Sequence, residues 1–185
     1  MFKKQTDLYL FEKVKLGDQK SFDLLFDRYY NSLCNYAFLY LKESALTQEI
    51  VADVYIKIWN NRESIEINTN LKSYFYRSTH NEVISHLRKA RLKTIPLDNI
   101  NDMGKPIDET PETLMINKEV CTTFSNMINS LPKQAGLVFR LHKVDGLTYK
   151  QIANVLGLSV KTIENHMGRA LKTMRKMFEA KPDIF

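Results

Sequence analysis

Two helical patterns follow each other in residues 148–171 with only a Gly-Leu step between them: TYKQIANVLGLSVKTIENHMGRAL. Thr148 and Gln151 have the spacing of a capping box, which predicts the start of the first helix, and Gly157 suits its end. Ser159 is a suitable N-cap for the second helix. Because so short a turn prevents an antiparallel arrangement, the two helices must cross steeply. The sequence therefore predicts a helix-turn-helix.

The second of these helices has two different faces when its residues are projected at 100° per residue. The predicted core of the motif comprises Ile152, Ala153, Leu156, Leu158, Val160, Ile163, Met167, Ala170, Leu171 and Met174. The opposite face is cationic and rich in hydrogen-bond donors: Lys161, Asn165, Gly168, Arg169, Lys172 and Lys176, with Glu164 at its edge. Such a face fits the major groove of DNA, where Lys and Arg meet guanine or phosphate, Asn can bind adenine and Glu cytosine. A solvated lysine-rich surface is the alternative interpretation.

Every other strong periodicity in the chain is also helical, since apolar residues recur in steps of three and four and no alternating segment is present. Thr6 and Thr47 are the expected N-caps of the first and third helices, and Gly17 closes the first. We therefore expect an all-α fold. The predicted helices before residue 148 cover residues 6–17, 21–41, 47–60, 71–91 and 132–143.

The charge of the chain is distributed in three blocks. Residues 1–94 contain 15 Lys and Arg against 11 Asp and Glu, residues 95–130 contain 2 against 6, and residues 131–185 contain 10 against 4. The acidic block also holds three of the five prolines. We therefore predict an N-terminal helical bundle at 1–94, an acidic linker at 95–115 and a four-helix domain with the helix-turn-helix at 116–185. The basic blocks favour a polyanionic partner, although solubilising charge explains them equally well.

Several classes of protein are disfavoured by what the sequence lacks. No run of about 18 apolar residues and no signal-peptide pattern occurs, so no membrane insertion is expected and a cytoplasmic protein is predicted. Cys34 and Cys121 are too few and too far apart for a disulfide framework or a zinc site. The four histidines are scattered and no glycine-rich phosphate loop is present. We therefore expect no metal, no cofactor and no enzymatic activity.

The helix predicted at 71–91 also has a mixed polar stripe. Its apolar side comprises Phe75, Tyr76, Val83, Leu87 and Ala90, and its opposite side Tyr74, Arg77, Asn81, Ser85 and Arg88. Aromatic, amide and guanidinium groups together are typical of surfaces that stack on unpaired bases and bind single strands. An ordinary solvated helix face has a similar composition.

The helix before it carries a different surface. Glu49, Asp53, Ile56 and Asn60 follow in steps of four, three and four, so two carboxylates and one apolar residue lie away from the core. Such a surface favours a protein partner with a basic, partly apolar groove. A solvated face with one stray isoleucine is the alternative.

Taken together, these segments resemble the RNA polymerase sigma factors of the sigma-70 family, in particular the small two-domain members of the extracytoplasmic-function (ECF) group. The likeness rests on LTQEIVADVYIKIW, on LKSYFYRSTHNEVISHLRKAR and on the segment from SLPKQAG to TMRK, in this order. The helix-turn-helix alone is common to many regulators, so the order and spacing of the three segments make the likeness specific.

The resemblance implies roles for each segment. It implies that the chain binds core RNA polymerase through the β′ clamp coiled coil and the β flap, directs it to promoter DNA, and is regulated by an anti-sigma factor. Glu49 and Asp53 match polymerase-docking acids, and Ile56 shares their surface. Asn81 matches the asparagine that helps to hold a flipped base of the −10 element, in a pocket formed by the loop at 60–70. The remaining predicted −10 contacts are Tyr74, Arg77 and Arg88.

The predicted −35 contacts are Lys161, Glu164, Asn165, Gly168, Arg169 and Lys172. Three positions depart from the family pattern. Ser85 stands where many members have an acid, and Glu164 and Gly168 stand where basic or bulky residues are frequent. The −35 base preference of this chain therefore does not follow from its relatives. The competing hypothesis is a stand-alone helix-turn-helix regulator that binds duplex DNA without polymerase.

Overall fold

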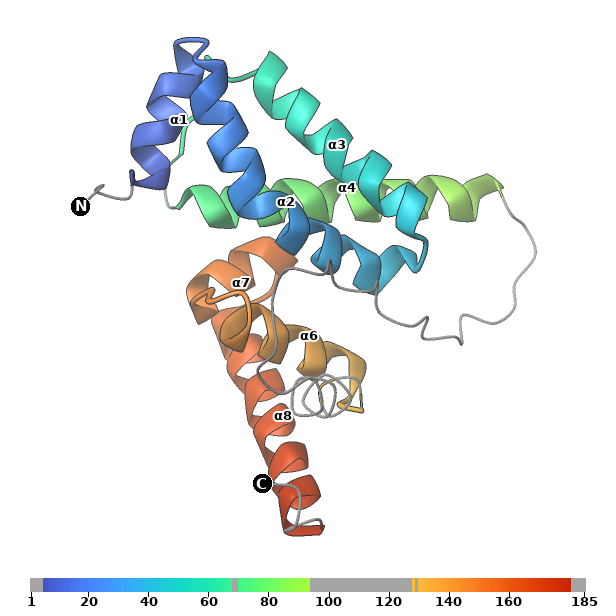
Figure 1. Ribbon diagram of the computed structural model, residues 1–185. Coiled ribbons are helices and arrows are strands. Elements are labelled where there is room, and N and C mark those ends of the chain that lie inside the picture. Colours follow the sequence, from blue (N-terminus) through green and yellow to red (C-terminus); the bar gives the residue numbers. More distant parts are fainter. Residues whose placement is uncertain (1–4, 68–69, 94–127, 129, 181–185) are drawn as a thin grey trace, which may run out of the picture. The chain divides into compact units, whose positions relative to one another are not determined.

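The computed structural model describes residues 5–67, 70–93, 128 and 130–180. Within these residues all regular structure is helical, which confirms the predicted all-α fold (Figure 1). The chain divides into two compact units, Met1–Asp108 and Glu109–Phe185. The acidic linker predicted at 95–115 and the first helix of the predicted four-helix domain lie outside the described residues. The helices are α1 Asp7–Lys15, α2 Gln19–Leu41, α3 Ser44–Asn60, α4 Leu71–Lys93, α6 Lys133–Lys143, α7 Tyr149–Leu156 and α8 Val160–Ala180.

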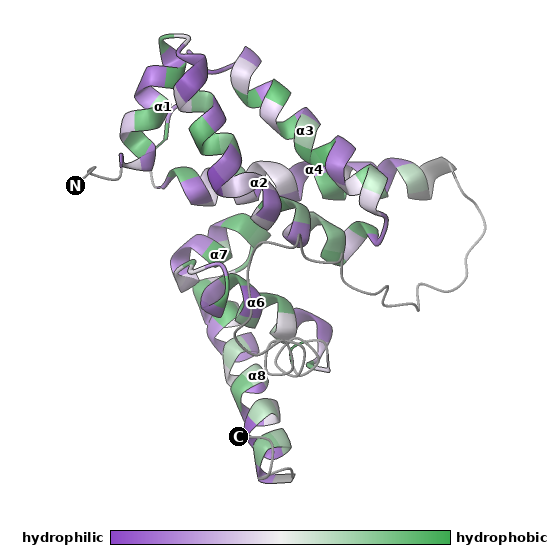
Figure 2. Ribbon diagram, viewed as in Figure 1, coloured by the Kyte–Doolittle hydropathy of each residue, from purple (hydrophilic) through white to green (hydrophobic). Residues whose placement is uncertain are grey.

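The first unit is held together by rings from three helices. The ring of Tyr55 on α3 lies 4.8 Å from that of Phe26 on α2 and 5.2 Å from that of Phe75 on α4, measured between centroids. Apolar and polar residues alternate along each helix (Figure 2), so each of them can turn an apolar side toward the others. Aromatic pairs of this kind add about 0.5–1.5 kcal/mol each beyond the apolar area they bury. The cluster therefore fixes α2, α3 and α4 relative to one another.

The sequence predicts two N-caps in the first unit, and the structure has one of them. The Thr6 hydroxyl accepts a hydrogen bond from the Tyr9 amide at 3.3 Å and caps α1, as predicted. The prediction for Thr47 is wrong, because α3 begins at Ser44. Thr47 is fully buried one turn later, and its hydroxyl donates to the Glu43 carbonyl oxygen at 2.6 Å. A threonine can be buried in a helix because its hydroxyl donates a hydrogen bond to a backbone carbonyl oxygen of the preceding turn.

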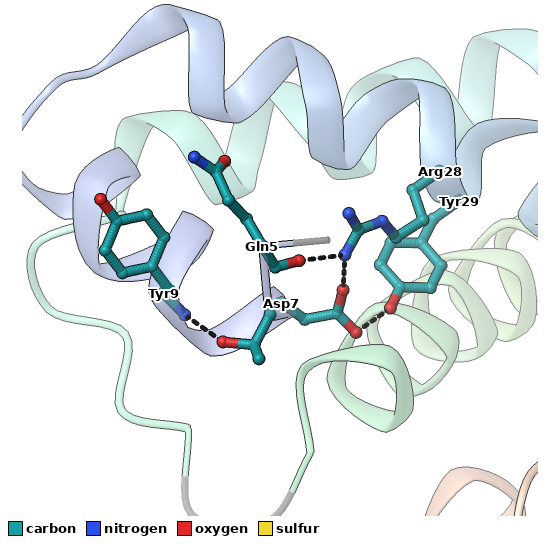
Figure 3. A network of polar contacts seen from close by, with 6 residues as sticks. Gln5, Asp7, Tyr9, Arg28 and Tyr29 are labelled. Carbon is teal, nitrogen blue, oxygen red and sulfur yellow. Dashed lines mark hydrogen bonds and ion pairs between the residues drawn. The ribbon is translucent and has the colours of Figure 1, made fainter. Parts of the chain in front are cut away.

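A polar network ties the start of α1 to α2 (Figure 3). The Asp7 carboxylate accepts hydrogen bonds from the Arg28 guanidinium and from the Tyr29 hydroxyl, one on each oxygen. Arg28 also donates to the Gln5 carbonyl oxygen at 3.3 Å. Burial, together with the Asp7 carboxylate, raises the pKa of Tyr29 well above its usual range. Tyr29 therefore remains a hydrogen-bond donor at any physiological pH.

The second unit has the predicted helix-turn-helix in detail. The Thr148 hydroxyl accepts from the Gln151 amide at 3.3 Å and the Gln151 side chain accepts from the Thr148 amide at 2.8 Å, which is a complete capping box. Gly157 ends α7 with a φ of 65°, a conformation that costs other residues energy. The Ser159 hydroxyl accepts from the Thr162 amide at 3.1 Å at the start of α8. These three local features set the crossing of α7 and α8.

The core of this motif is smaller than the sequence indicates. Ile152 and Ile163 are fully buried, whereas Leu158, Val160 and Leu171 are 39%, 41% and 49% exposed. Leu158 lies in the short turn and Val160 is the first residue of α8, so both stand where the chain passes from one helix to the next. Leu171 lies at the edge of the apolar face of α8, about 20° from Val160 on a helical projection. The assignment of these three residues to the core is therefore wrong.

We expect Tyr29→Phe to lower the free energy of unfolding of the first unit by about 1–2 kcal/mol, because Asp7 loses one of its two donors in a partly buried site. The measurement is urea unfolding followed by tryptophan emission, since the chain's one tryptophan, Trp59, lies in this unit.

Tyr9→Phe is the matched control, because Tyr9 is 49% exposed on α1 and keeps its ring beneath Lys13 after the substitution. Equal urea midpoints for the two variants would show that the Asp7 network does not stabilise the unit.

Candidate nucleic-acid interface

The predicted DNA-contacting residues of α8 lie on one exposed face of the second unit. Lys161, Glu164, Asn165, Gly168, Arg169 and Lys172 are all exposed. Lys161 and Glu164 pair with each other at 3.4 Å. Asn165, Arg169 and Lys172 make no polar contact with any residue that the structure describes. Their donors are therefore available to an external ligand.

Gly168 lies in the middle of this face without an internal reason to be glycine. A Cβ atom at this position meets nothing within 4 Å. Glycine in a helix interior costs about 1 kcal/mol relative to alanine. The position therefore lowers helix stability and leaves the backbone of α8 open to close approach from outside.

The polar stripe of α4 is present over the first part of the helix. Arg77, Asn81 and Arg88 are exposed and Tyr74 is half-buried, while Phe75, Tyr76 and Val83 are buried on the other side. Leu87 and Ala90, expected on the buried side, are exposed. Between Ile84 and Ala90 no residue of α4 is buried, because these turns extend past the described neighbours that cover the start of the helix. Arg88 therefore lies on a segment without a buried residue, in which Ser85 and His86 are partly covered and the others are exposed.

A pocket with a cavity volume of about 130 Å³ opens between α3 and α4. Its wall includes an ion pair that links the two helices, since Lys57 Nζ lies 2.5 Å from Glu82 Oε2. Asn81 does not line the pocket, although it precedes Glu82 on α4. Lys57, Ser78 and Glu82 were not predicted from the sequence. The four-residue spacing of Tyr74, Ser78 and Glu82 indicates that these three residues share one face of α4. The lining residues are Val54, Lys57, Ile58, Asn61, Ile65, Tyr74, Ser78 and Glu82.

The surface predicted for a protein partner borders a larger groove. Glu49 and Asp53 are exposed and Ile56 is 57% exposed. Ile56 lines a groove with a volume of about 380 Å³ between α2 and α3. The residues that α2 contributes to this groove were not predicted, because no local sequence pattern shows which residues of two helices contact each other. The groove is lined by Gln19, Phe22, Phe26, Ala52, Tyr55, Ile56 and Trp59.

His80 is a titratable residue of the first unit that takes part in its packing. His80 is half-buried, and its Nδ1 lies 2.8 Å from the Tyr36 hydroxyl. Burial lowers the pKa of His80, so it is neutral near pH 7. Among the described residues no group of three His, Cys, Asp or Glu side chains is placed to hold a metal ion. Over the same residues, no helix has both the length and the apolar character needed to span a membrane.

Two family models match the chain. The model of sigma-70 region 2 matches residues 25–93, which include α3, α4 and the pocket between them. The model of sigma-70 region 4 matches residues 122–174, which include the helix-turn-helix. The order of the two matches is the order predicted from the sequence.

Relatives and solved structures agree with these matches. The chain is 28% identical over 165 residues to the ECF RNA polymerase sigma-E factor of Escherichia coli strain K12, covering 84% of this chain and 85% of the relative. The ECF RNA polymerase sigma-E factor of Haemophilus influenzae is 27% identical, and the match covers 84% of this chain and 86% of that relative.

Two solved structures share the fold at 20% identity. The sigma factor RpoE in complex with the anti-sigma factor NepR from Bartonella quintana has a TM-score of 0.65, with 86% of this chain and 98% of that chain covered. CnrH in complex with the cytosolic domain of CnrY has a TM-score of 0.63, and the match covers 95% of this chain and 99% of that chain. The chain therefore belongs to the sigma-70 family of RNA polymerase sigma factors, in its ECF group.

Proposed function

We propose that this chain binds core RNA polymerase and selects promoters by binding the −35 element with α8 and the −10 element with α4 and the adjacent pocket. The observation that carries the proposal is the exposed face of hydrogen-bond donors on α8. The capping box at Thr148 and the N-cap Ser159 fix the helix-turn-helix that presents this face. Family membership supports the promoter-selecting function, and the exposed residues of this chain support the assignment of each element. Sigma factors are transcription initiation factors, and catalysis by this chain is not part of the proposal.

At the −35 element α8 enters the major groove. Arg169 and Lys172, which have no partner among the described residues, contact guanine or phosphate, and Asn165 contacts adenine. Glu164 accepts from cytosine once Lys161 leaves their 3.4 Å pair for a phosphate. Because phosphate contacts displace counterions, binding through this face weakens as salt rises.

At the −10 element the first unit captures a base that has left the stack. Tyr74 lines the pocket between α3 and α4, and Asn81 and Arg77 lie exposed on the same helix. Unstacking a base costs a few kcal/mol, which binding in the pocket and stacking on an aromatic side chain offset. Promoter melting is thereby coupled to recognition of the captured base.

The groove between α2 and α3 is the proposed polymerase contact. Its aromatic lining accepts apolar side chains, and Glu49 and Asp53 on α3 attract basic ones. This chemistry suits a basic, partly apolar element such as the β′ clamp coiled coil, and the β flap is the second proposed contact. An anti-sigma factor is a further proposed partner, since the RpoE relative is described in complex with one.

A stand-alone regulator that binds duplex DNA is the competing function. It is favoured by the helix-turn-helix but gives no role to the groove beside Ile56 or to the pocket beside Glu82. We expect the purified chain to shift promoter DNA weakly by itself and strongly with core polymerase in an electrophoretic mobility assay. A strong, sequence-specific shift by the chain alone would favour the regulator.

In the same assay we expect Ile56→Glu to weaken the polymerase-dependent complex at least about tenfold, because a charge replaces an exposed apolar contact at the groove. Leu24→Glu, a matched change at a 48% exposed position of α2 outside the groove, leaves the complex intact. Equal complexes with the two variants would argue against the groove as the polymerase contact.

The two DNA elements act at different stages of initiation. We expect Asn81→Ala to reduce promoter opening at least about tenfold while the closed complex still forms, because the base is captured only after melting. Arg169→Ala should weaken the closed complex by a similar factor, because it removes a duplex contact worth about 1–3 kcal/mol. Permanganate reactivity of unpaired thymines reports opening, and a filter-binding assay at low temperature reports the closed complex. Equal losses at both stages in both variants would contradict this division.

A further inference from the structure

Trp59, near the end of α3, lines the groove between α2 and α3 and is half-buried. Two side chains contact its ring. The ring of Phe22 on α2 lies 4.9 Å away between centroids, with the two planes inclined by 60°. The guanidinium carbon of Arg62 lies 4.6 Å from the centroid of the indole, within the range of a cation–π contact. The indole is therefore restrained both by another helix and by the turn that follows its own helix.

Arg62 is itself held in place by the backbone. Its Nη1 donates to the Trp59 carbonyl oxygen at 2.8 Å, and its backbone amide donates to the same oxygen at 3.4 Å. This carbonyl belongs to the last turn of α3, where the helix dipole favours a positive charge. The turn is closed by Ser64, whose amide and hydroxyl donate to the Asn61 carbonyl oxygen at 3.0 and 2.9 Å. These bonds keep the guanidinium beside the indole.

Arg62 lines neither the groove between α2 and α3 nor the pocket between α3 and α4. Its side chain is 24% exposed, and its Nε is buried without a hydrogen-bond partner among the described residues. Its pair with Glu63 spans 3.6 Å to a carboxylate that is 79% exposed, so this pair contributes little to stability. The contacts with Trp59 are therefore the main interactions of the guanidinium.

We propose that Arg62 is a positioning residue for the groove between α2 and α3, because its guanidinium holds the Trp59 indole as a fixed part of the groove wall. A partner that fills the groove then meets a ring already in place, and less conformational freedom is lost on binding. Arginine suits this role because its planar group can stack on a ring while it donates to a backbone oxygen, whereas the ammonium of lysine is a point charge. The inference rests on the proposed polymerase contact at this groove.

The first measurement is made on the free chain. Trp59 is its one tryptophan, so acrylamide quenching of tryptophan emission reports the exposure of this indole. Arg62→Gln should raise the quenching constant at least about twofold, because the ring loses the guanidinium that covers it. Arg62→Lys keeps the charge and should give a smaller rise. Lys13→Gln is the matched control, since it removes a cation 5.9 Å from the centroid of the Tyr9 ring on α1 and should leave Trp59 unchanged.

The second measurement is the affinity of core RNA polymerase for the full chain carrying a fluorescent label at its N-terminus, followed by anisotropy. Arg62→Gln should weaken binding by about fivefold, the size expected for loss of one cation–π contact, and Arg62→Lys by less. In a Trp59→Ala background, Arg62→Gln should cause no further loss, because Arg62 acts only through the indole. Urea unfolding followed by far-ultraviolet circular dichroism checks that each variant is folded. Should Arg62→Gln not fold, Arg62→Lys with and without Trp59→Ala gives the same comparison.

Unchanged quenching in Arg62→Gln would overturn the inference while leaving the groove as the proposed polymerase contact. Additive losses of affinity in the double variant would also overturn it, because they would show that Arg62 contacts polymerase directly. By contrast, equal affinities of the wild type and Trp59→Ala for core polymerase would overturn the proposed contact at the groove, and this inference with it.

Discussion

The ring of Tyr55 is the point at which α2, α3 and α4 meet, and the two candidate binding surfaces of the first unit depend on it. Tyr55 is 3% exposed and contacts the rings of Phe22, Phe26 and Phe75. Its packing fixes α3, and α3 contributes residues to the groove beside Ile56 and to the pocket beside Glu82. The position of the proposed polymerase contact and that of the proposed base pocket are therefore set by the same aromatic cluster.

This arrangement places unlike chemistry on adjacent faces of one helix. Ala52, Ile56 and Trp59 present an apolar surface to the groove, while Lys57 and Asn61 present polar groups to the pocket. A partner bound in the groove contacts residues next to those that line the pocket. The proposed polymerase contact and the proposed base pocket thus share α3, so the two proposed contacts would stabilise the same conformation of this helix.

Local sequence signals predicted the second unit more completely than the first. The capping box at Thr148, the glycine at 157 and the cap at Ser159 each involve residues within a few positions of one another, so their geometry follows from spacing alone. The exposed donors of α8 follow from the same helical period. The error at Leu158 and Val160 arose because a period shows which side of a helix is apolar and not how much of that side a neighbour covers.

The candidate sites of the first unit depend on contacts between distant segments, and the sequence predicted only one side of each. Glu49, Asp53 and Ile56 were predicted from their spacing, but the contribution of Phe22 and Phe26 requires the packing of α2 on α3. Similarly, Asn81 was placed on a polar stripe, whereas the pair of Lys57 with Glu82 links residues 25 positions apart. Neither partner is unusual alone, so no local pattern distinguishes them from solvated surface charge.

The chain is proposed to select transcription start sites only while it is bound to core RNA polymerase. The most direct measurement is run-off transcription from fragmented genomic DNA by core polymerase, with and without the chain, followed by mapping of the start sites. We predict that the chain restricts initiation to a small set of sites that share two sequence elements at a fixed separation. Start sites that do not change when the chain is added, together with its failure to associate with core polymerase, would contradict the account.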